Sequence, residues 1–209
     1  MTDPVSVLDL GSDENRFSPD WLQRVHSFVD GVEGPLVTTG SGKFYSNGLD
    51  LDWLMANGDQ AAKYVAEVQE LLARILTLPV PTVAAVNGHA FGAGAMFAMA
   101  HDFRVMRADR GYFCFPEADI NIPFTPGMAA LIQGKLTPAA AIASMTTGRR
   151  FGGPDALAVG LVDETAPEAD LVTVASSRVA ALAGKDRGTL GAIKATMFAP
   201  AATALRTPA

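Results

Sequence analysis

One glutamate in an apolar setting is the best candidate in this sequence for acid–base chemistry. Glu117 follows Pro116 within residues 113–124, where aromatic and aliphatic side chains predominate. Burial among such groups disfavours the charged carboxylate, which raises the pKa and makes the group a better base. From this stretch alone, a catalytic base and an exposed glutamate at a turn are equally good interpretations.

Two glycine-containing loops could supply backbone N–H groups to a substrate oxygen. Residues 87–96, Asn-Gly-His-Ala-Phe-Gly-Ala-Gly-Ala-Met, follow an apolar run. They are typical of a tight turn leading into a helix whose free N–H groups favour anions. Residues 46–50, Ser-Asn-Gly-Leu-Asp, follow a second strand-like run, and the Asn-Gly turn predicts an unpaired Leu49 N–H facing a cleft. Two such groups could form an oxyanion hole; the alternative is that the glycines serve only close helix–strand packing.

Several other chemistries lack the residues they need. The loop at 87–96 has neither the Lys-Ser/Thr ending of a phosphate-binding loop nor the third glycine of a dinucleotide loop. The three histidines do not form a set, and no serine or cysteine stands in a nucleophile elbow. No spacing of His, Asp and Glu suggests a metal site. Cys114, among aromatic residues, is interpreted as a buried thiol rather than a nucleophile.

Composition excludes further classes of protein. The chain has 209 residues, 49% hydrophobic and 18% charged, which favours a packed core over a disordered chain. Its 16 basic and 22 acidic residues give a net charge of −6, which argues against binding nucleic acid or an anionic membrane. The longest apolar run, residues 90–100, is too short for a membrane span, which needs about 20 residues. With no secretion signal at its start, a cytoplasmic protein is expected.

The elements that must position these loops alternate between strand and helix. Apolar runs predict strands at residues 5–10, 36–39, 82–86 and 103–106. Helical periodicity and capping signals predict helices at 18–32, 61–76, 139–146, 154–159 and 171–182, with a weaker pattern at 184–197. Alternation as far as about residue 163 predicts an α/β fold with a mainly parallel sheet, followed by an alanine-rich helical tail.

Together the segments resemble the crotonase, or enoyl-CoA hydratase/isomerase, superfamily. The matching segments are 42–51, 81–94, 115–120 and 147–162, in the family's order over roughly residues 5–165. The resemblance implies a crotonase-type ββα spiral core with surrounding helices over residues 1–165. It implies a helical C-terminal segment over 166–209, shorter than in most relatives. It also implies acyl-CoA thioester substrates, no separate cofactor, and homotrimers or dimers of trimers.

The resemblance also implies which residues form the site. The family's oxyanion hole falls on the backbone N–H groups of Leu49 and Ala93, and its Pro-Glu carboxylate falls on Glu117. The second glutamate of the hydratases is replaced here by Met96. One carboxylate can take a proton from the carbon α to the thioester and return it at the γ carbon. The expected activity is therefore a Δ3,Δ2-enoyl-CoA isomerase of fatty-acid β-oxidation.

Two other functions stay open at this point. A hydratase or another crotonase-type enzyme could use Glu117 with an ordered water, and a non-catalytic protein could simply bind acyl-CoA. Candidate walls of an acyl pocket, each equally plausible as a core residue, are Trp53, Met96, Ile122 and Phe124. Residues 115–127 are similar to the peroxisomal isomerases of the family. The final residues, Arg206-Thr207-Pro208-Ala209, are not the peroxisomal tripeptide address.

Overall fold

The computed structural model describes residues 5–207 and contains two parallel sheets. The larger sheet has the order β1-β2-β4-β6-β8, with β1 Ser6–Asp9, β2 Leu36–Thr39, β4 Thr82–Val86, β6 Phe103–Arg107 and β8 Glu164–Ala166. The smaller sheet has the order β3-β5-β7, with β3 Phe44–Ser46, β5 His89–Phe91 and β7 Phe113–Cys114. The chain passes from a strand of the larger sheet to one of the smaller sheet and then into helix. This repeat is the predicted ββα spiral within an α/β fold.

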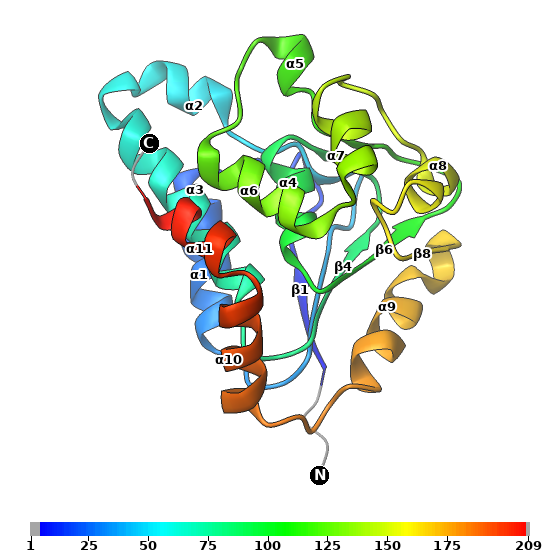
Figure 1. The fold of residues 1–209 in the computed structure, drawn as a ribbon. Helices are drawn as coiled ribbons and strands as arrows, with labels where there is room; N and C mark the ends of the chain where they lie inside the picture. Colours follow the sequence, from blue (N-terminus) through cyan, green and yellow to red (C-terminus); the bar gives the residue numbers. More distant parts are fainter. Residues whose placement is uncertain (1–4, 208–209) are drawn as a thin grey trace.

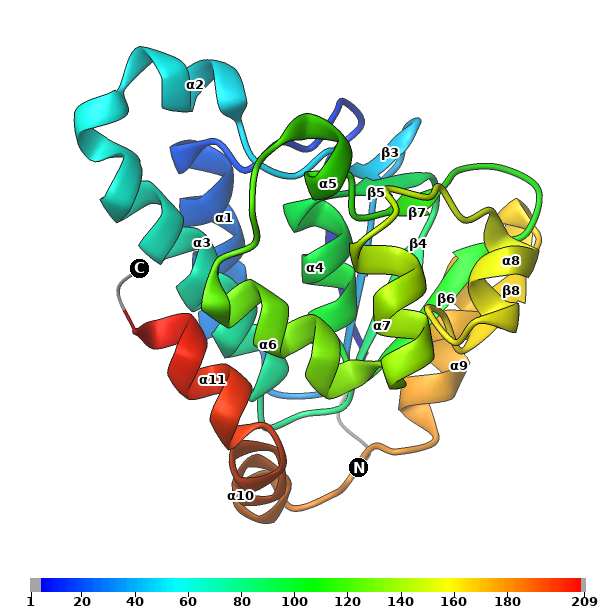
Figure 2. The ribbon, with the colours of Figure 1, turned by 45° about the horizontal axis from the view of Figure 1, so that its top comes forward.

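Helices surround the two sheets (Figure 1). Their bounds are α1 Pro19–Asp30, α2 Leu51–Ala56, α3 Ala61–Leu76, α4 Ala93–Ala100, α5 Glu117–Ile120, α6 Pro126–Lys135, α7 Pro138–Met145, α8 Gly153–Ala158, α9 Leu171–Ala180, α10 Arg187–Met197 and α11 Ala199–Arg206. Helix α4 is buried along its whole length, with α3 and α6 beside it (Figure 2). In residues 5–207 no helix has both the length and the apolar character that crossing a membrane demands.

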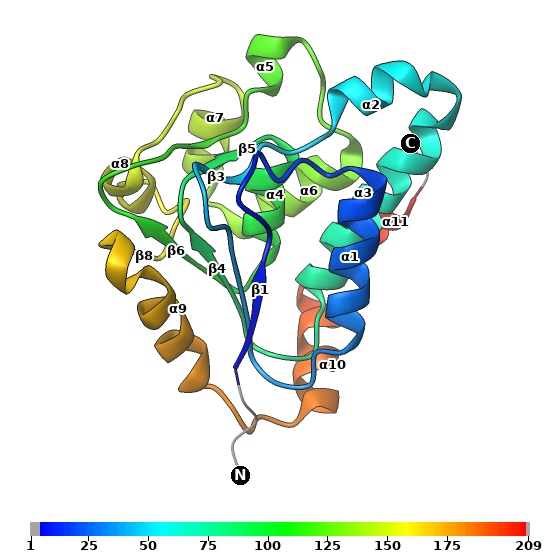
Figure 3. The same cartoon turned by 180° about the vertical axis from the view of Figure 1, so that it is seen from behind.

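The larger sheet is covered on both faces, so its strands are apolar on both sides. In β4, Val83 and Ala85 belong to a small core completed by α9, whereas Ala84 and Val86 belong to the main core on the opposite face. Figure 3 shows α9 on one side of the sheet and α1 and α3 on the other. Successive residues of a strand point to opposite faces, which explains the continuous apolar run of β4.

Most predicted elements are present, but the strands β3, β5, β7 and β8 and the helices α2, α5, α6 and α11 were not predicted. The bounds predicted for β2, β4 and α3 are those observed, whereas the weak helix at 184–197 begins at Arg187 and is followed by the separate helix α11. The loop at 87–96 contains the strand β5 between its turn and its helix. A strand of two or three residues carries no readable periodicity, which is why the smaller sheet was not predicted. The predicted division at residue 165 falls within β8 and stays a prediction.

A buried ion pair joins α10 to the edge of the larger sheet. Lys194 donates to the Asp102 carboxylate at 2.6 Å and to the Val80 carbonyl at 2.7 Å. The same carboxylate accepts the Thr82 N–H at 2.8 Å, directly at the start of β4. Lys194 is buried, so its charge depends on this one carboxylate.

Replacing Asp102 should therefore be costly. Asp102→Ala leaves the Lys194 ammonium buried without a counter-charge and is expected to lower the free energy of unfolding by about 3–5 kcal/mol. Urea denaturation followed by circular dichroism measures this change. The matched control is Glu70→Ala, which removes the exposed ion pair to Arg206 and should cost less than about 1 kcal/mol. Equal costs for the two variants would contradict the structural role given to Asp102.

Candidate functional site

A cavity of about 380 Å³ lies where the loop after β3, the start of α4 and the start of α5 meet. Its lining comprises Arg16, Asn47, Leu49, Leu51, Asp52, Met55, Phe91, Gly92, Ala93, Pro116, Glu117, Ile120 and Ile122. A larger cavity of about 520 Å³ lies between α3, α6 and α11. Its charged lining residues, Glu70 and Arg206, are paired with each other, so it offers no free acid or base. The smaller cavity is therefore the candidate site.

Glu117 is the one buried acidic group of this cavity. It begins the short helix α5 directly after Pro116, and only 9% of the residue is exposed. Its Oε2 is buried without a hydrogen-bond partner among the described residues, and burial raises the pKa of the carboxyl to about 7. Its Oε1 faces Gly92, since a Cβ built on that glycine would lie 3.4 Å away. A desolvated carboxyl at the start of α4 is suited to take and return a proton near neutral pH.

Two glycines with left-handed backbone bring the loops at 46–50 and 91–94 together. Gly48 has a φ of 81° and Gly92 a φ of 51°, a region that side chains rarely adopt. A Cβ at Gly48 would lie 2.9 Å from the Ala93 nitrogen. Neither the Leu49 N–H nor the Ala93 N–H donates a hydrogen bond to any part of residues 5–207. Two free N–H groups on the wall of one cavity could polarise a carbonyl oxygen.

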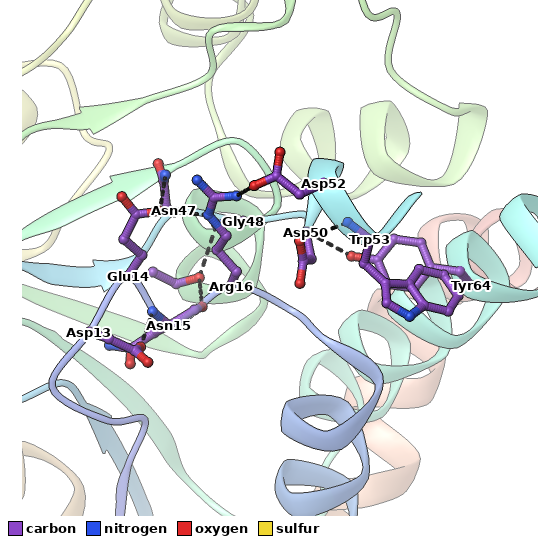
Figure 4. A network of polar contacts seen from close by, with 11 residues as sticks. Asp13, Glu14, Asn15, Arg16, Asn47, Gly48, Asp50, Asp52, Trp53 and Tyr64 are labelled. Atoms are coloured by element: carbon purple, nitrogen blue, oxygen red, sulfur yellow. Dashed lines mark hydrogen bonds and ion pairs between the residues drawn. The ribbon is translucent and has the colours of Figure 1, made fainter. Parts of the chain in front are cut away.

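The N-terminal segment holds the 46–50 loop from one side (Figure 4). The Glu14 carbonyl accepts the Asn47 N–H at 2.8 Å, and the Glu14 carboxylate accepts the Asn47 side-chain N–H at 3.2 Å. The Phe17 N–H donates to the Gly48 carbonyl at 2.9 Å. These contacts fix the peptide that precedes Leu49. Residues 13–17 have no regular periodicity, so sequence reasoning did not find them.

Helices α2 and α3 hold the loop from the other side. Asp50 caps α2 by accepting the Trp53 N–H at 3.1 Å, and its own N–H donates to the Tyr64 hydroxyl at 2.9 Å. Burial raises the pKa of Tyr64 to about 12, so the hydroxyl stays protonated. Arg16 pairs with Asp52 at 2.7 Å and thereby links the N-terminal segment to α2 across the edge of the cavity.

The structure brings some of the predicted site residues together and separates others. Those that line the cavity are Leu49, Ala93, Glu117 and Ile122. Met96 is 1% exposed within the main core, Trp53 lies against Tyr64 with ring centroids 5.1 Å apart, and Phe124 lies against Phe115 at 6.2 Å. These three do not line the cavity. Its remaining apolar wall includes Met55 and Ile120, both exposed to solvent and missed because surface residues show no distinctive pattern.

Two other predictions concern metal and thiol chemistry. Residues 5–207 contain no cluster of three or more His, Cys, Asp or Glu side chains arranged for a metal ion. Cys114 is buried as predicted, and its Sγ donates to the Gly148 carbonyl at 3.3 Å. Burial raises the pKa of this thiol to about 11, which makes it a poor nucleophile at neutral pH.

Known proteins share both the sequence and the fold. The family described as enoyl-CoA hydratase/isomerase matches residues 27–208. Enoyl-CoA delta isomerase 3 of Arabidopsis thaliana is 40% identical over 167 residues, which are 75% of this chain and 70% of that one. A probable enoyl-CoA hydratase of Mycobacterium tuberculosis has a TM-score of 0.91 at 28% identity, covering 100% of this chain and 90% of that one. Human mitochondrial delta3-delta2-enoyl-CoA isomerase, at 23% identity, shares the fold with a TM-score of 0.87, covering 97% and 84%.

The environment of Glu117 predicts a pH-dependent stability difference. Because burial raises its pKa from 4.5 to about 7, the neutral carboxyl stabilises the fold, and this stability is lost as pH rises from about 4.5 through 7. Glu117→Gln stays neutral at every pH. The free energy of unfolding of the variant relative to the natural chain should therefore increase by about 2–3 kcal/mol between pH 4.5 and pH 8. Urea denaturation at several pH values measures it; a constant difference would mean that water solvates the carboxyl.

Proposed function

This chain belongs to the enoyl-CoA hydratase/isomerase family, and we propose that it moves the double bond of a 3-enoyl-CoA ester to the 2-position. Glu117 carries the proton, and the N–H groups of Leu49 and Ala93 bind the thioester oxygen. The observation that carries the proposal is a desolvated carboxyl, whose Oε2 has no hydrogen-bond partner among the described residues, beside two free backbone N–H groups. The named activity of the Arabidopsis relative, at 40% identity, supports the isomerase over the hydratase.

The proposed reaction is a proton transfer between two carbons of one substrate. Ionised Glu117 removes a proton from C2 of the 3-enoyl thioester, and the electron pair moves into a dienolate. The negative charge on the thioester oxygen is stabilised by the two N–H groups. Protonated Glu117 then returns the proton to C4, which leaves the double bond between C2 and C3. A carboxyl with a pKa of about 7 can serve as both base and acid at neutral pH.

The fixed loop explains how the oxygen would be bound without rearrangement. The Leu49 N–H is positioned by hydrogen bonds of its neighbours, Asn47 to Glu14 and Asp50 to Tyr64. The Ala93 N–H is the first of α4, whose dipole adds partial positive charge at the same place. Donors that are already oriented need not reorganise as charge develops on the oxygen.

The proposal extends to the setting of the reaction. Coenzyme A enters only as part of the substrate, and the double-bond shift is placed in fatty-acid β-oxidation. We propose a homotrimer or a dimer of trimers located in the cytoplasm. Enoyl-CoA delta isomerase 2 of Arabidopsis thaliana, 35% identical to this chain, is named peroxisomal, so peroxisomes are the competing compartment. Light scattering of the purified chain tests the assembly.

Removing the basic group of Glu117 should strongly lower the turnover. Glu117→Gln keeps the shape of the side chain and loses its basicity, so turnover of a 3-enoyl-CoA ester is expected to fall by about a hundredfold or more. Spectrophotometric detection of the 2-enoyl product measures it. The matched control is Asp119→Asn, since this exposed carboxylate of the same helix does not line the cavity and its variant should keep nearly full turnover. Near-full activity of Glu117→Gln would show the proton transfer to be wrongly placed.

The absence of a second carboxylate at the position of Met96, in the first turn of α4, should favour isomerisation over hydration. Hydration requires a water to be activated at one carbon while a proton reaches another, a task that two carboxylates share, and a thioether cannot act as a base. We expect the ratio of isomerase to hydratase turnover to exceed one in the natural chain and to fall in Met96→Glu. Met96→Leu is the apolar control and should keep the ratio.

The natural chain alone already tests the ranking of these two activities. Met96 is 1% exposed, so a glutamate there can destabilise the fold, and thermal unfolding of each variant is measured alongside turnover. Strong hydration of 2-enoyl-CoA by the natural chain, with no double-bond migration in 3-enoyl-CoA, would favour the hydratase.

A further inference from the structure

A separate cavity of about 270 Å³ lies at the opposite edge of the larger sheet from Glu117. It is bounded by Pro81 before β4, Phe103 at the start of β6, the end of α6 and one side of α10. The candidate active site instead lies beyond the other ends of these strands. In Figure 1, α10 is at the bottom of the molecule and α5 is at the top. A ligand of one cavity therefore does not occupy the other.

This cavity is rich in lysine. Of the five lysines in the chain, three line it: Lys135, Lys185 and Lys194. Lys194 is neutralised by Asp102 at 2.6 Å. Within residues 5–207, neither Lys135 nor Lys185 forms an ion pair with a carboxylate. In a chain with a net charge of −6, the cavity is thus lined by three ammonium groups and one carboxylate, that of Asp102, which is paired with Lys194.

Lys135 is positioned to bind an anion. Its Nζ donates to the His101 carbonyl at 2.8 Å and lies 5.0 Å from the centroid of the Phe198 ring. An ammonium has three N–H donors, and the described residues accept only this one bond. Burial lowers the pKa of Lys135 to about 8, which still leaves it charged at pH 7. Asp102 and Asp163 lie near Lys135 but beyond ion-pair distance. A partly desolvated ammonium without an ion-paired carboxylate is unfavourable, and a bound anion would relieve that cost.

The rest of the wall is suited to an aliphatic chain. Ile193 and Met197 lie one turn apart on α10 and are 55% and 68% exposed. Leu182, Leu190 and Phe103 continue the apolar surface inside the cavity. Burying these side chains under an alkyl chain would be favourable in proportion to the area covered.

We propose that this cavity binds a medium-chain fatty carboxylate. The carboxylate head lies at the ammonium groups of Lys135 and Lys185, and the alkyl chain lies along Ile193 and Met197. The volume of about 270 Å³ is just below the range of typical small-molecule sites, about 300–1,000 Å³, which favours a chain of medium length over a long one. This site is independent of the acyl-CoA cavity, so its test does not depend on the catalytic activity.

The test compares head groups on one alkyl chain. The natural chain is labelled with ¹³C at its methionine methyl groups and titrated with decanoate, decanol or decylammonium while NMR spectra are recorded. The Met197 resonance is the one that is missing from the spectrum of Met197→Leu. Decanoate should shift the Met197 resonance until the site is saturated. Its affinity should be about tenfold or more above that of decanol, and decylammonium should bind most weakly of the three. Lys135→Met should abolish the preference for decanoate. Lys63→Met, which removes an exposed lysine of α3, should leave it unchanged.

Several results would overturn the proposal. Equal binding of decanoate and decanol by the natural chain would mean that charge plays no part, and this comparison needs no folded variant. A preference that survives in folded Lys135→Met would place the carboxylate elsewhere. Displacement of decanoate by crotonyl-CoA would place it in the Glu117 cavity. A Met197 resonance that responds to protein concentration and not to decanoate would make this face a contact between copies of the chain.

Discussion

No side chain fits between the 46–50 loop and the first turn of α4. A Cβ on Gly48 would meet the Phe91 carbonyl at 2.7 Å, and a Cβ on Gly94 would meet the Ser46 carbonyl at 2.4 Å. Because two backbones meet without intervening side chains, the Leu49 and Ala93 N–H groups reach the same cavity. The contact also places α4 between the sheets, where all of its residues are buried. The convergence of these two N–H groups therefore depends on the absence of a side chain at Gly48 and Gly94.

The site combines groups that are each unfavourable in isolation. The Glu117 carboxyl has lost solvent and gained no partner for Oε2, and two N–H groups lack acceptors within residues 5–207. Buried polar groups are normally satisfied, so such departures cluster where a ligand completes them. The surrounding hydrogen bonds, from the Asn47 side chain to Glu14 and from the Asp50 N–H to Tyr64, keep these groups from relaxing toward one another. The rest of the fold thus holds an unsatisfied carboxyl and two unsatisfied N–H groups on one cavity.

Helices α1 and α3 and strand β4 were predicted well because each has a period or a cap that can be read, whereas the 10-residue helix α6 was not predicted. Helix α3 has an apolar face through 16 residues, and β4 is continuously apolar because both sheet faces are covered. The two loops and Glu117 were candidates from glycine spacing and from an acidic residue in an apolar run, and the resemblance to the family implied their roles. The smaller sheet escaped prediction because strands of two or three residues show no alternation. Whether Met96 lines the cavity or lies in the core depends on the rotation of α4 about its own axis, and the sequence does not determine that rotation.

The strand order of the larger sheet bears on how the chain is made. In the order β1-β2-β4-β6-β8, each new strand pairs with the strand of this sheet that preceded it in the chain, so the sheet can grow at one edge as the polypeptide leaves the ribosome. One face of that growing sheet, with Val37, Val83 and Val105, is covered by α9, which begins only at Leu171. At about 5–20 residues per second, this apolar face stays open for seconds during synthesis. Until α9 has been made, this apolar face of the nascent chain is accessible to other chains and to chaperones.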